Sequence, residues 1–310
     1  TTTMFCSSTV TGSFPRLPLV KRFKSLGPIS GLLPKVKPNC SSHSFPFSIT
    51  LPEAPRRLSR RILTPPSAIM LHANPVVSDV YATGISVGVA FSFLRLWQET
   101  AKRGIFDQKL NRKLVHISIG LAFMLCWPLF SSRSQARLLA ALVPGVNIFR
   151  MLLIGLGIQK DEATVKSMSR FGDYRELLKG PLYYASTVTF ASVMYWRTSP
   201  LAIALICNLC AGDGMADIVG RRFGSKKIPY NRNKSFAGSI AMASAGFLAS
   251  IGYMYYFSSF GYIERSWRMI LGFLIVSVST TVVESLPISS ELDDNLTVPL
   301  TSVLVGSLIF

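Results

Sequence analysis

Eight apolar runs divide the chain beyond residue 70, and charged or turn-forming residues separate each run from the next. A run of about 20 apolar residues crosses a bilayer as a helix, because a helix satisfies its own backbone hydrogen bonds there. The predicted spans are residues 76–97, 114–130, 138–158, 181–196, 200–211, 237–257, 269–288 and 296–310, of which the fifth is too short to cross alone. We therefore predict an all-α fold over residues 71–310, a multispanning integral membrane helical bundle of about seven to eight transmembrane helices.

The charge balance of the chain narrows the class of partner. Only 15 % of the 310 residues are charged and the mean hydropathy is positive, yet the formal net charge is +18. Such a basic chain often binds nucleic acid, but here apolar runs long enough to span a bilayer separate the basic residues. The expected partners are therefore the lipid bilayer and a phosphate-bearing substrate, with no nucleic acid and no protein partner indicated.

Residues 1–70 differ in composition from the rest of the chain. They are rich in Ser, Thr and Pro, and they contain many basic residues but a single acidic one, Glu53. This composition is typical of a plastid transit peptide, and it predicts a disordered leader and a multi-pass protein of a chloroplast membrane, the inner envelope or the thylakoid. An ordinary disordered tail is the alternative.

Beyond the leader, loops rich in basic residues alternate along the chain with loops poor in them. Sixteen basic residues lie in the loops after the first, third and fifth spans, and five lie in the loops between these. Because Lys and Arg stay on the side that is not translocated, the three rich loops are predicted to face one compartment, stroma or cytosol. That compartment is also where a soluble nucleotide would be found.

The most polar stretch of the membrane region follows the fifth span. Asp213 and Asp217 stand four residues apart, which on a helix places both carboxylates on one face. Six cations follow them, namely Arg221, Arg222, Lys226, Lys227, Arg232 and Lys234. We predict a nucleotide loop over residues 211–238 in which the two aspartates hold Mg²⁺ and the cations, Arg221 and Arg222 among them, neutralise phosphate oxygens.

The glycines of this loop are predicted to serve the same site. Gly212, Gly214 and Gly238 would let backbone N–H groups approach a phosphate. Two alternatives remain open at this point. Each aspartate could pair with Arg221 or Arg222 one turn on, or the segment could be a basic loop that faces lipid headgroups.

Three further groups are candidates for chemistry. Lys234, followed by Ser235 and Gly238 at a helix start, would offer an ammonium, a hydroxyl and free N–H groups to a phosphate, although the order of residues is not that of a P-loop. Glu284 lies inside an apolar run, where a carboxylate is costly and is a functional candidate by default. Either Glu284 or Asp294 could act as the base for a substrate hydroxyl, or as a further metal ligand.

Three weaker candidates have plain structural interpretations. Cys207 and Cys210 form a CxxC pair, which is typical of redox or metal sites, but their apolar neighbours and the lack of a second pair favour packing. His116 could orient a polar group near the interface, although a single His beside Arg112 and Lys113 is more often structural.

The run GDGMADIVGRRFG, followed by NKSFAGSIAM and then ESLPISSELDDNLTVPL, resembles the polyprenol kinase family of integral membrane enzymes. That family includes dolichol kinase and the plastid phytol and farnesol kinases. The resemblance covers about residues 105–310, and the stretches RKLVHI and RELLKGPLYY are most similar to the plant farnesol kinases.

The resemblance implies a CTP-dependent kinase that phosphorylates a membrane-dissolved prenyl alcohol with the help of Mg²⁺, farnesol being expected and geranylgeraniol or phytol next. It implies Asp213 and Asp217 as ligands of the Mg-nucleotide, and it matches Asp294 and Asn295 to the DN motif of the family. Two other functions stay open. One is nucleotidyl transfer to phosphatidate, as in distantly related cytidylyltransferases, and the other is a transporter or lipid-binding protein without turnover.

Overall fold

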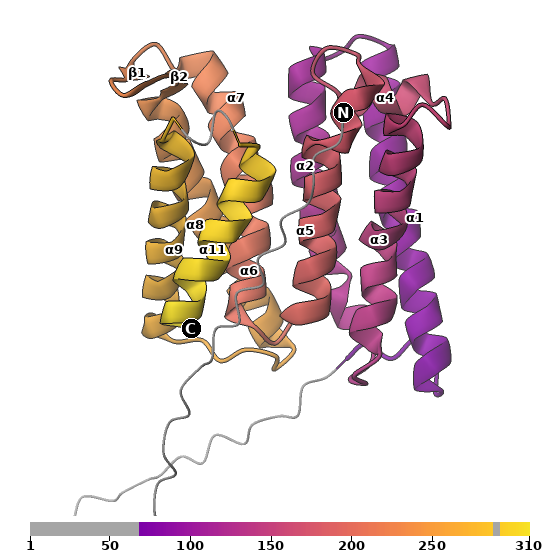
Figure 1. The fold of residues 1–310 in the computed structure, drawn as a ribbon. Coiled ribbons are helices and arrows are strands. Elements are labelled where there is room, and N and C mark those ends of the chain that lie inside the picture. Colours follow the sequence, from indigo (N-terminus) through magenta and orange to yellow (C-terminus); the bar gives the residue numbers. More distant parts are fainter. Residues whose placement is uncertain (1–67, 288–291) are drawn as a thin grey trace, which may run out of the picture. The chain divides into compact units, whose positions relative to one another are not determined.

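The computed structural model describes residues 68–287 and 292–310, which form a bundle of helices (Figure 1). The predicted leader lies outside the described residues except for residues 68–70, and so do residues 288–291. The helices of the bundle are α1 (Pro75–Lys102), α2 (Gln108–Leu125), α3 (Ala136–Gly155), α5 (Gly180–Met194), α6 (Pro200–Cys207), α7 (Asp213–Phe223), α8 (Phe236–Ser259), α9 (Trp267–Ser285) and α11 (Asp294–Ile309). Short helices η1 (Trp127–Leu129), α4 (Glu162–Met168) and η2 (Tyr174–Leu178) lie in the connections.

Each predicted span corresponds to a helix of the described chain. Six helical stretches there are long and apolar enough to cross a membrane. Helices α5 and α11, with 15 and 16 residues, are shorter and pack against one another in the same bundle. The structure thus confirms the all-α, multispanning membrane fold, to which a small β-hairpin is added.

The fifth predicted span is the beginning of a longer central helix. Helix α6 continues through a π-helical turn, η3 (Asn208–Gly212), into α7, so that one helical stretch runs over Pro200–Phe223. In its most apolar window 78 % of the residues are buried, against 22 to 50 % in the other five. The short apolar run therefore spans as part of a longer helix that its neighbours surround.

The segment 211–238, predicted to be a loop, is a helix and a hairpin. The backbone N–H and the side-chain amide of Asn208 both donate to the Ala204 carbonyl oxygen, the side chain at 2.8 Å, where the π-turn adds one residue to the helix. After α7 the chain forms the antiparallel strands β1 (Lys227–Ile228) and β2 (Asn231–Ser235), and Ser235 caps α8 by accepting from the Gly238 N–H. The polar residues thus have a rigid scaffold instead of a mobile loop.

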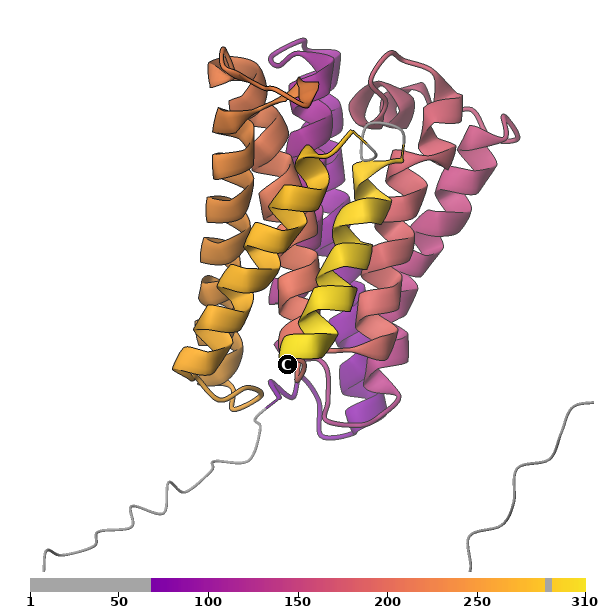
Figure 2. The ribbon, with the colours of Figure 1, turned by 60° about the vertical axis from the view of Figure 1, so that its left-hand side comes forward.

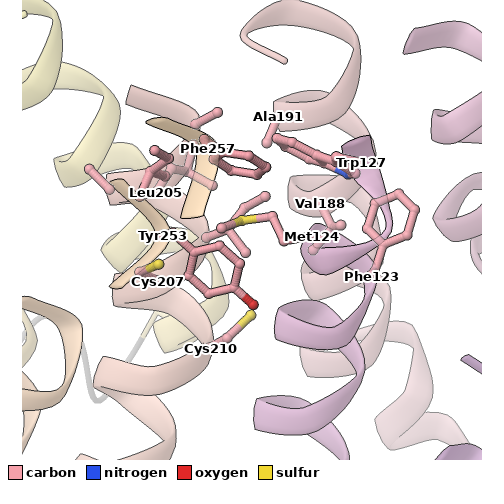
Figure 3. Close-up of a cluster of buried hydrophobic side chains, with 14 of the residues drawn as sticks. Phe123, Met124, Trp127, Val188, Ala191, Leu205, Cys207, Cys210, Tyr253 and Phe257 are labelled. Carbon is pink, nitrogen blue, oxygen red and sulfur yellow. The ribbon is translucent and has the colours of Figure 1, made fainter. Parts of the chain in front are cut away.

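Hydrophobic side chains from α1, α2, η1, α3, α5, α8 and α9 meet around the central helix. Trp127 and Phe257 stack with ring centroids 5.9 Å apart, and Phe123 meets the Trp127 ring edge-on. Figure 3 shows Cys207 and Cys210 among these side chains, and both thiols are free and completely buried. The packing interpretation of the CxxC pair therefore agrees with the structure.

A buried arginine lies in the connection between α5 and α6. Figure 2 shows the hairpin and the C-terminus at opposite ends of the bundle. Arg197 is only 3 % exposed, and its guanidinium donates to the carbonyl oxygens of Trp127, Phe130 and Ser131 at 2.6–2.7 Å. The carboxylate of Asp79 accepts from the backbone N–H and the hydroxyl of Ser131 at 2.6 and 2.8 Å. This cation of a basic-poor loop is thus satisfied inside the protein.

We expect Gly246→Ala to destabilise the bundle, because a Cβ there would lie 2.3 Å from the Asn208 Oδ1 atom. Overpacking of this kind costs about 1–3 kcal/mol, and small residues let membrane helices approach closely. Gly252→Ala, on the same helix α8, is the matched control, since a Cβ there meets nothing within 4 Å. Thermal unfolding in detergent would show a lower Tm for Gly246→Ala alone, and equal Tm values would contradict this account of the packing.

Candidate active site

A polar cavity of about 870 Å³ opens at the end of the bundle that carries the hairpin. Its walls come from α2, α5, α7, the hairpin, α8, α9 and α11, together with the connection after α4. The cationic side chains that line it are Lys109, Arg112, Lys113, Arg170, Lys179, Arg221, Lys227 and Lys234, and the acidic ones are Asp213, Asp217, Glu284, Asp293 and Asp294. Cations outnumber acids, so the cavity suits a polyanion that also carries a metal ion.

The three basic-rich loops meet at this cavity. Lys109 belongs to the segment after the first span, Arg170 and Lys179 to the segment after the third, and Lys227 to the segment after the fifth. The structure therefore confirms that these loops lie at one end of the bundle. Which compartment this end faces stays a prediction.

Asp213 is held by two residues of α2. Its Oδ2 atom lies 2.7 Å from the Lys113 ammonium and 3.4 Å from His116 Nε2. His116 Nε2 is also 2.7 Å from the Leu209 carbonyl oxygen. Because a carbonyl only accepts, Nε2 carries a proton, and the ring links the π-turn to the carboxylate. Asp213 pairs with α2 and not with Arg221 or Arg222, contrary to one sequence alternative.

Asp217 is more open and does pair along its own helix. Its Oδ2 atom accepts from Arg221 at 2.8 Å, and the two side chains are about one-third exposed. Arg221 also approaches Asp107 at 3.4 Å. The sequence alternative of an i,i+4 pair thus holds for this aspartate, which nevertheless lines the cavity one helical turn from Asp213.

Lys234 is brought to the centre of the site by the hairpin. Asn231 donates to the carbonyl oxygens of Ser285 and Leu286 at 3.1 and 3.2 Å, which fixes β2 against the end of α9. The Lys234 ammonium then meets the carboxylate of Glu284, and Asp294 Oδ2 lies 3.2 Å away.

The charge state of Lys234 follows from these neighbours. Burial by itself lowers the pKa of the ammonium, but the nearby carboxylates of Asp294 and Glu284 outweigh it and hold the pKa above its ordinary value. Lys234 is therefore a cation at neutral pH. An ammonium has three donors, so after its two carboxylate partners one N–H can still reach a ligand.

Asp294 and Asn295 begin helix α11. Asp293 caps this helix by accepting from the Asn295 backbone N–H at 2.9 Å, and it also accepts from the Asn295 amide at 2.6 Å. The Asp294 Oδ1 and Asn295 Oδ1 atoms are buried and have no hydrogen-bond partner among the described residues. Buried acceptors without partners are rare in native proteins, so these two atoms indicate a place where a donor is missing.

Of the remaining predicted site residues, some line the cavity and others do not. Gly212 and Gly214 lie outside the cavity, and a Cβ at Gly214 would strike Ile117 at 2.2 Å, so their small size serves helix packing. Arg222 is exposed and points over the Phe223 ring instead. Ser235 and Gly238 do line the cavity, but they bond to each other at 3.2 Å.

Several cationic side chains in the cavity were missed as individual residues in the sequence analysis. Lys113 is the clearest case, since it is buried against Asp213 from a position 100 residues earlier in the chain. Arg112, Arg170 and Lys179 also line the cavity. The charge asymmetry of the loops placed all of these residues on the same side of the membrane, and it was the sequence feature that could have indicated them.

The aspartates of α7 fit the donor set of Mg²⁺ bound with a nucleotide. Mg²⁺ is held in such sites by one or two carboxylates together with phosphates and waters. The ion pairs of Asp213 and Asp217 both use Oδ2, which leaves the second oxygen of each carboxylate. No group of three His, Cys, Asp or Glu side chains in residues 68–287 and 292–310 is arranged to hold a metal by itself.

Comparison with known proteins gives close relatives. The chain is 78 % identical to a probable chloroplastic phytol kinase 3 of Glycine max, over 77 % of this chain and 75 % of that protein. It is 68 % identical to the chloroplastic farnesol kinase of Arabidopsis thaliana (79 % and 80 % covered), and 47 % identical to phytol kinase 1 of the same plant (76 % and 78 % covered). No protein-family model and no solved structure matches the chain.

Proposed function

The chain belongs to the family of chloroplast farnesol and phytol kinases, and from this we propose that it phosphorylates a prenyl alcohol in a chloroplast membrane. The donor is CTP, the reaction is assisted by Mg²⁺, and farnesol is the preferred acceptor, with geranylgeraniol and phytol next. The product is the alcohol monophosphate. The site faces the stroma, on the side of the basic-rich loops.

One observation of the structure supports this proposal more than any other. A single cavity combines two carboxylates on one helix face with eight cationic side chains, at one end of a bundle whose helices are long and apolar enough to cross a membrane. Phosphoryl transfer depends mainly on positioning and on neutralising the charge of the phosphate oxygens. The cavity supplies the groups for both tasks.

Asp213 and Asp217 would hold Mg²⁺, which when bound neutralises charge on the phosphates. Lys113 and His116 position Asp213, because they fix the carboxylate by contacts of 2.7 and 3.4 Å. Lys234 of the hairpin and Arg221 of α7, which both line the cavity, bind phosphate oxygens, and the surrounding basic side chains attract the nucleotide from solution.

We assign the removal of the hydroxyl proton to Asp294. Its Oδ2 atom is held near Lys234 at 3.2 Å, while its Oδ1 atom has no partner among the described residues and can accept from a donor. The alcohol oxygen, once its proton passes to Asp294, attacks the terminal phosphorus and the nucleoside diphosphate leaves. A general base of this kind contributes about 10²–10⁴-fold to a rate.

The reaction class can be tested with labelled nucleotide. Membranes that contain the full chain, incubated with farnesol and CTP, should place label from the γ-phosphate in farnesyl monophosphate and none from the α-phosphate. The same assay with ATP, geranylgeraniol and phytol tests the donor and the acceptor. Lipid labelled from the α-phosphate would indicate nucleotidyl transfer and overturn the kinase proposal.

Asp217→Asn should weaken the affinity for Mg²⁺, because an amide oxygen binds the ion less well than a carboxylate. We expect the Mg²⁺ concentration for half-maximal rate to rise by at least about 10-fold. Asp173→Asn is the matched control, since Asp173 is exposed and lies outside the cavity. Asp173 caps the short helix η2, and an asparagine caps a helix about as well as an aspartate. An unchanged Mg²⁺ titration for Asp217→Asn would remove this residue from the metal site.

Asp294→Asn should lower kcat by at least about 100-fold, while the KM for CTP stays within about twofold, since the amide cannot take a proton. The fall in rate toward acidic pH that a carboxylate base produces should also disappear in this variant. If Asp294→Asn keeps a wild-type kcat, or loses activity only through the KM for CTP, Asp294 is not the base.

A further inference from the structure

A second cavity, of about 480 Å³, lies among the spans. Its walls are formed by α1, α2, α3 and α5, and by Met168 at the end of α4. The side chains that line it are predominantly aliphatic and aromatic, and they include Val87, Phe91, Phe123, Leu142, Val143 and Val188. Cavities of roughly 300–1,000 Å³ are the usual size for a small-molecule ligand.

The polar side chains in this wall are largely engaged elsewhere. The Thr83 hydroxyl donates to the Asp79 carbonyl oxygen at 2.8 Å, and the Tyr184 hydroxyl donates to that of His116 at 2.8 Å. The Arg150 guanidinium is paired with Asp161 at 2.6 Å. Apart from the Asn147 amide, the cavity therefore offers a ligand a hydrocarbon surface, which would leave a phosphate or a base without partners.

Three segments of the chain contribute to both the apolar cavity and the polar one. Tyr184 lines the apolar cavity while the preceding residue, Tyr183, lines the polar cavity. Met168 lines the apolar cavity, and Arg170, two residues later, lines the polar cavity. On α2, Ile119 follows Lys113 of the polar cavity by six residues, which is about 9 Å of helix. Three separate segments thus run from one cavity to the other over short distances.

We propose that the apolar cavity binds the isoprenoid chain of the alcohol and that its depth sets the chain length the enzyme prefers. This inference rests on the proposed kinase function and adds the place of the acceptor to it. The chain lies between α1, α3 and α5, and the hydroxyl passes the Tyr183–Tyr184 wall toward the polar cavity. The occupant is a single prenyl chain, which lies in the apolar cavity while its hydroxyl reaches the phosphate-transfer site.

Ala90 on α1 provides the test, because it lines the cavity and is only partly buried. A phenylalanine at this position fills space that the chain would occupy. Ala90→Phe should lower kcat/KM for the C20 alcohol geranylgeraniol by at least about 10-fold relative to the C10 alcohol geraniol, since pocket contacts discriminate by such factors. The KM for CTP should not change.

Ser92→Phe is the matched control, since Ser92 lies two residues further along α1, is exposed and does not line the cavity. It should leave the preference for chain length at the wild-type value. Phe91→Ala, which enlarges the cavity, should shift the preference toward longer alcohols. If Ala90→Phe lowers the rate equally for all chain lengths, or behaves like Ser92→Phe, the proposal is overturned.

A binding readout separates this inference from the proposed function. A farnesol analogue with a photoreactive diazirine at the chain end should label peptides of α1 and α3 in the wild-type protein, and unlabelled farnesol should compete. Labelling of this kind without any turnover would support the cavity and refute the kinase proposal. If phospholipid reduces the labelling and farnesol does not, the cavity is a phospholipid site. That result would overturn the inference even if the enzyme is active.

Discussion

The polar end of this protein depends on one constraint, that a charge removed from water needs a partner of opposite charge. The Lys113–Asp213 pair joins α2 to α7, and the contacts of Lys234 with Glu284 and Asp294 join the hairpin to α9 and α11. These partners are 50 to 100 residues apart in the chain. The cavity is therefore assembled by the same interactions that neutralise its buried charges.

A kinase for a lipid alcohol has to bring together two substrates that share no solvent, and the structure offers a separate environment for each. The polar cavity is lined by cations and carboxylates, and the apolar cavity is lined mainly by hydrocarbon. Helices α2 and α5 contribute to both, so a displacement of either helix would alter the two cavities together. The buried ion pair at Lys113 and the aromatic contact between His116 and Tyr184, 4.4 Å between ring centroids, oppose such a displacement.

Much of the fold could be predicted from sequence, because each span must satisfy its own hydrogen bonds and so forms a helix wherever an apolar run is long enough. The short run at residues 200–211 is the instructive exception. It continues into α7 through a π-helical turn and is buried by the surrounding helices, neither of which hydropathy can report. The hairpin escaped prediction for a similar reason, since its anchoring at Ser285 and Leu286 is tertiary.

The sequence by itself determined the class of protein, the gathering of the basic-rich loops at one end of the bundle, and the carboxylates of α7, α9 and α11 as candidates for chemistry. These features depend on local composition and on the distribution of charge along the chain. Only the tertiary structure decided that Asp213 pairs with Lys113 while Asp217 pairs with Arg221, that Gly214 packs against Ile117, and that Arg222 points away. The physical reason is that a helix face has no fixed partner until other helices pack on it, and here Lys113 and Ile117, which meet Asp213 and Gly214, come from α2, about 100 residues earlier in the chain.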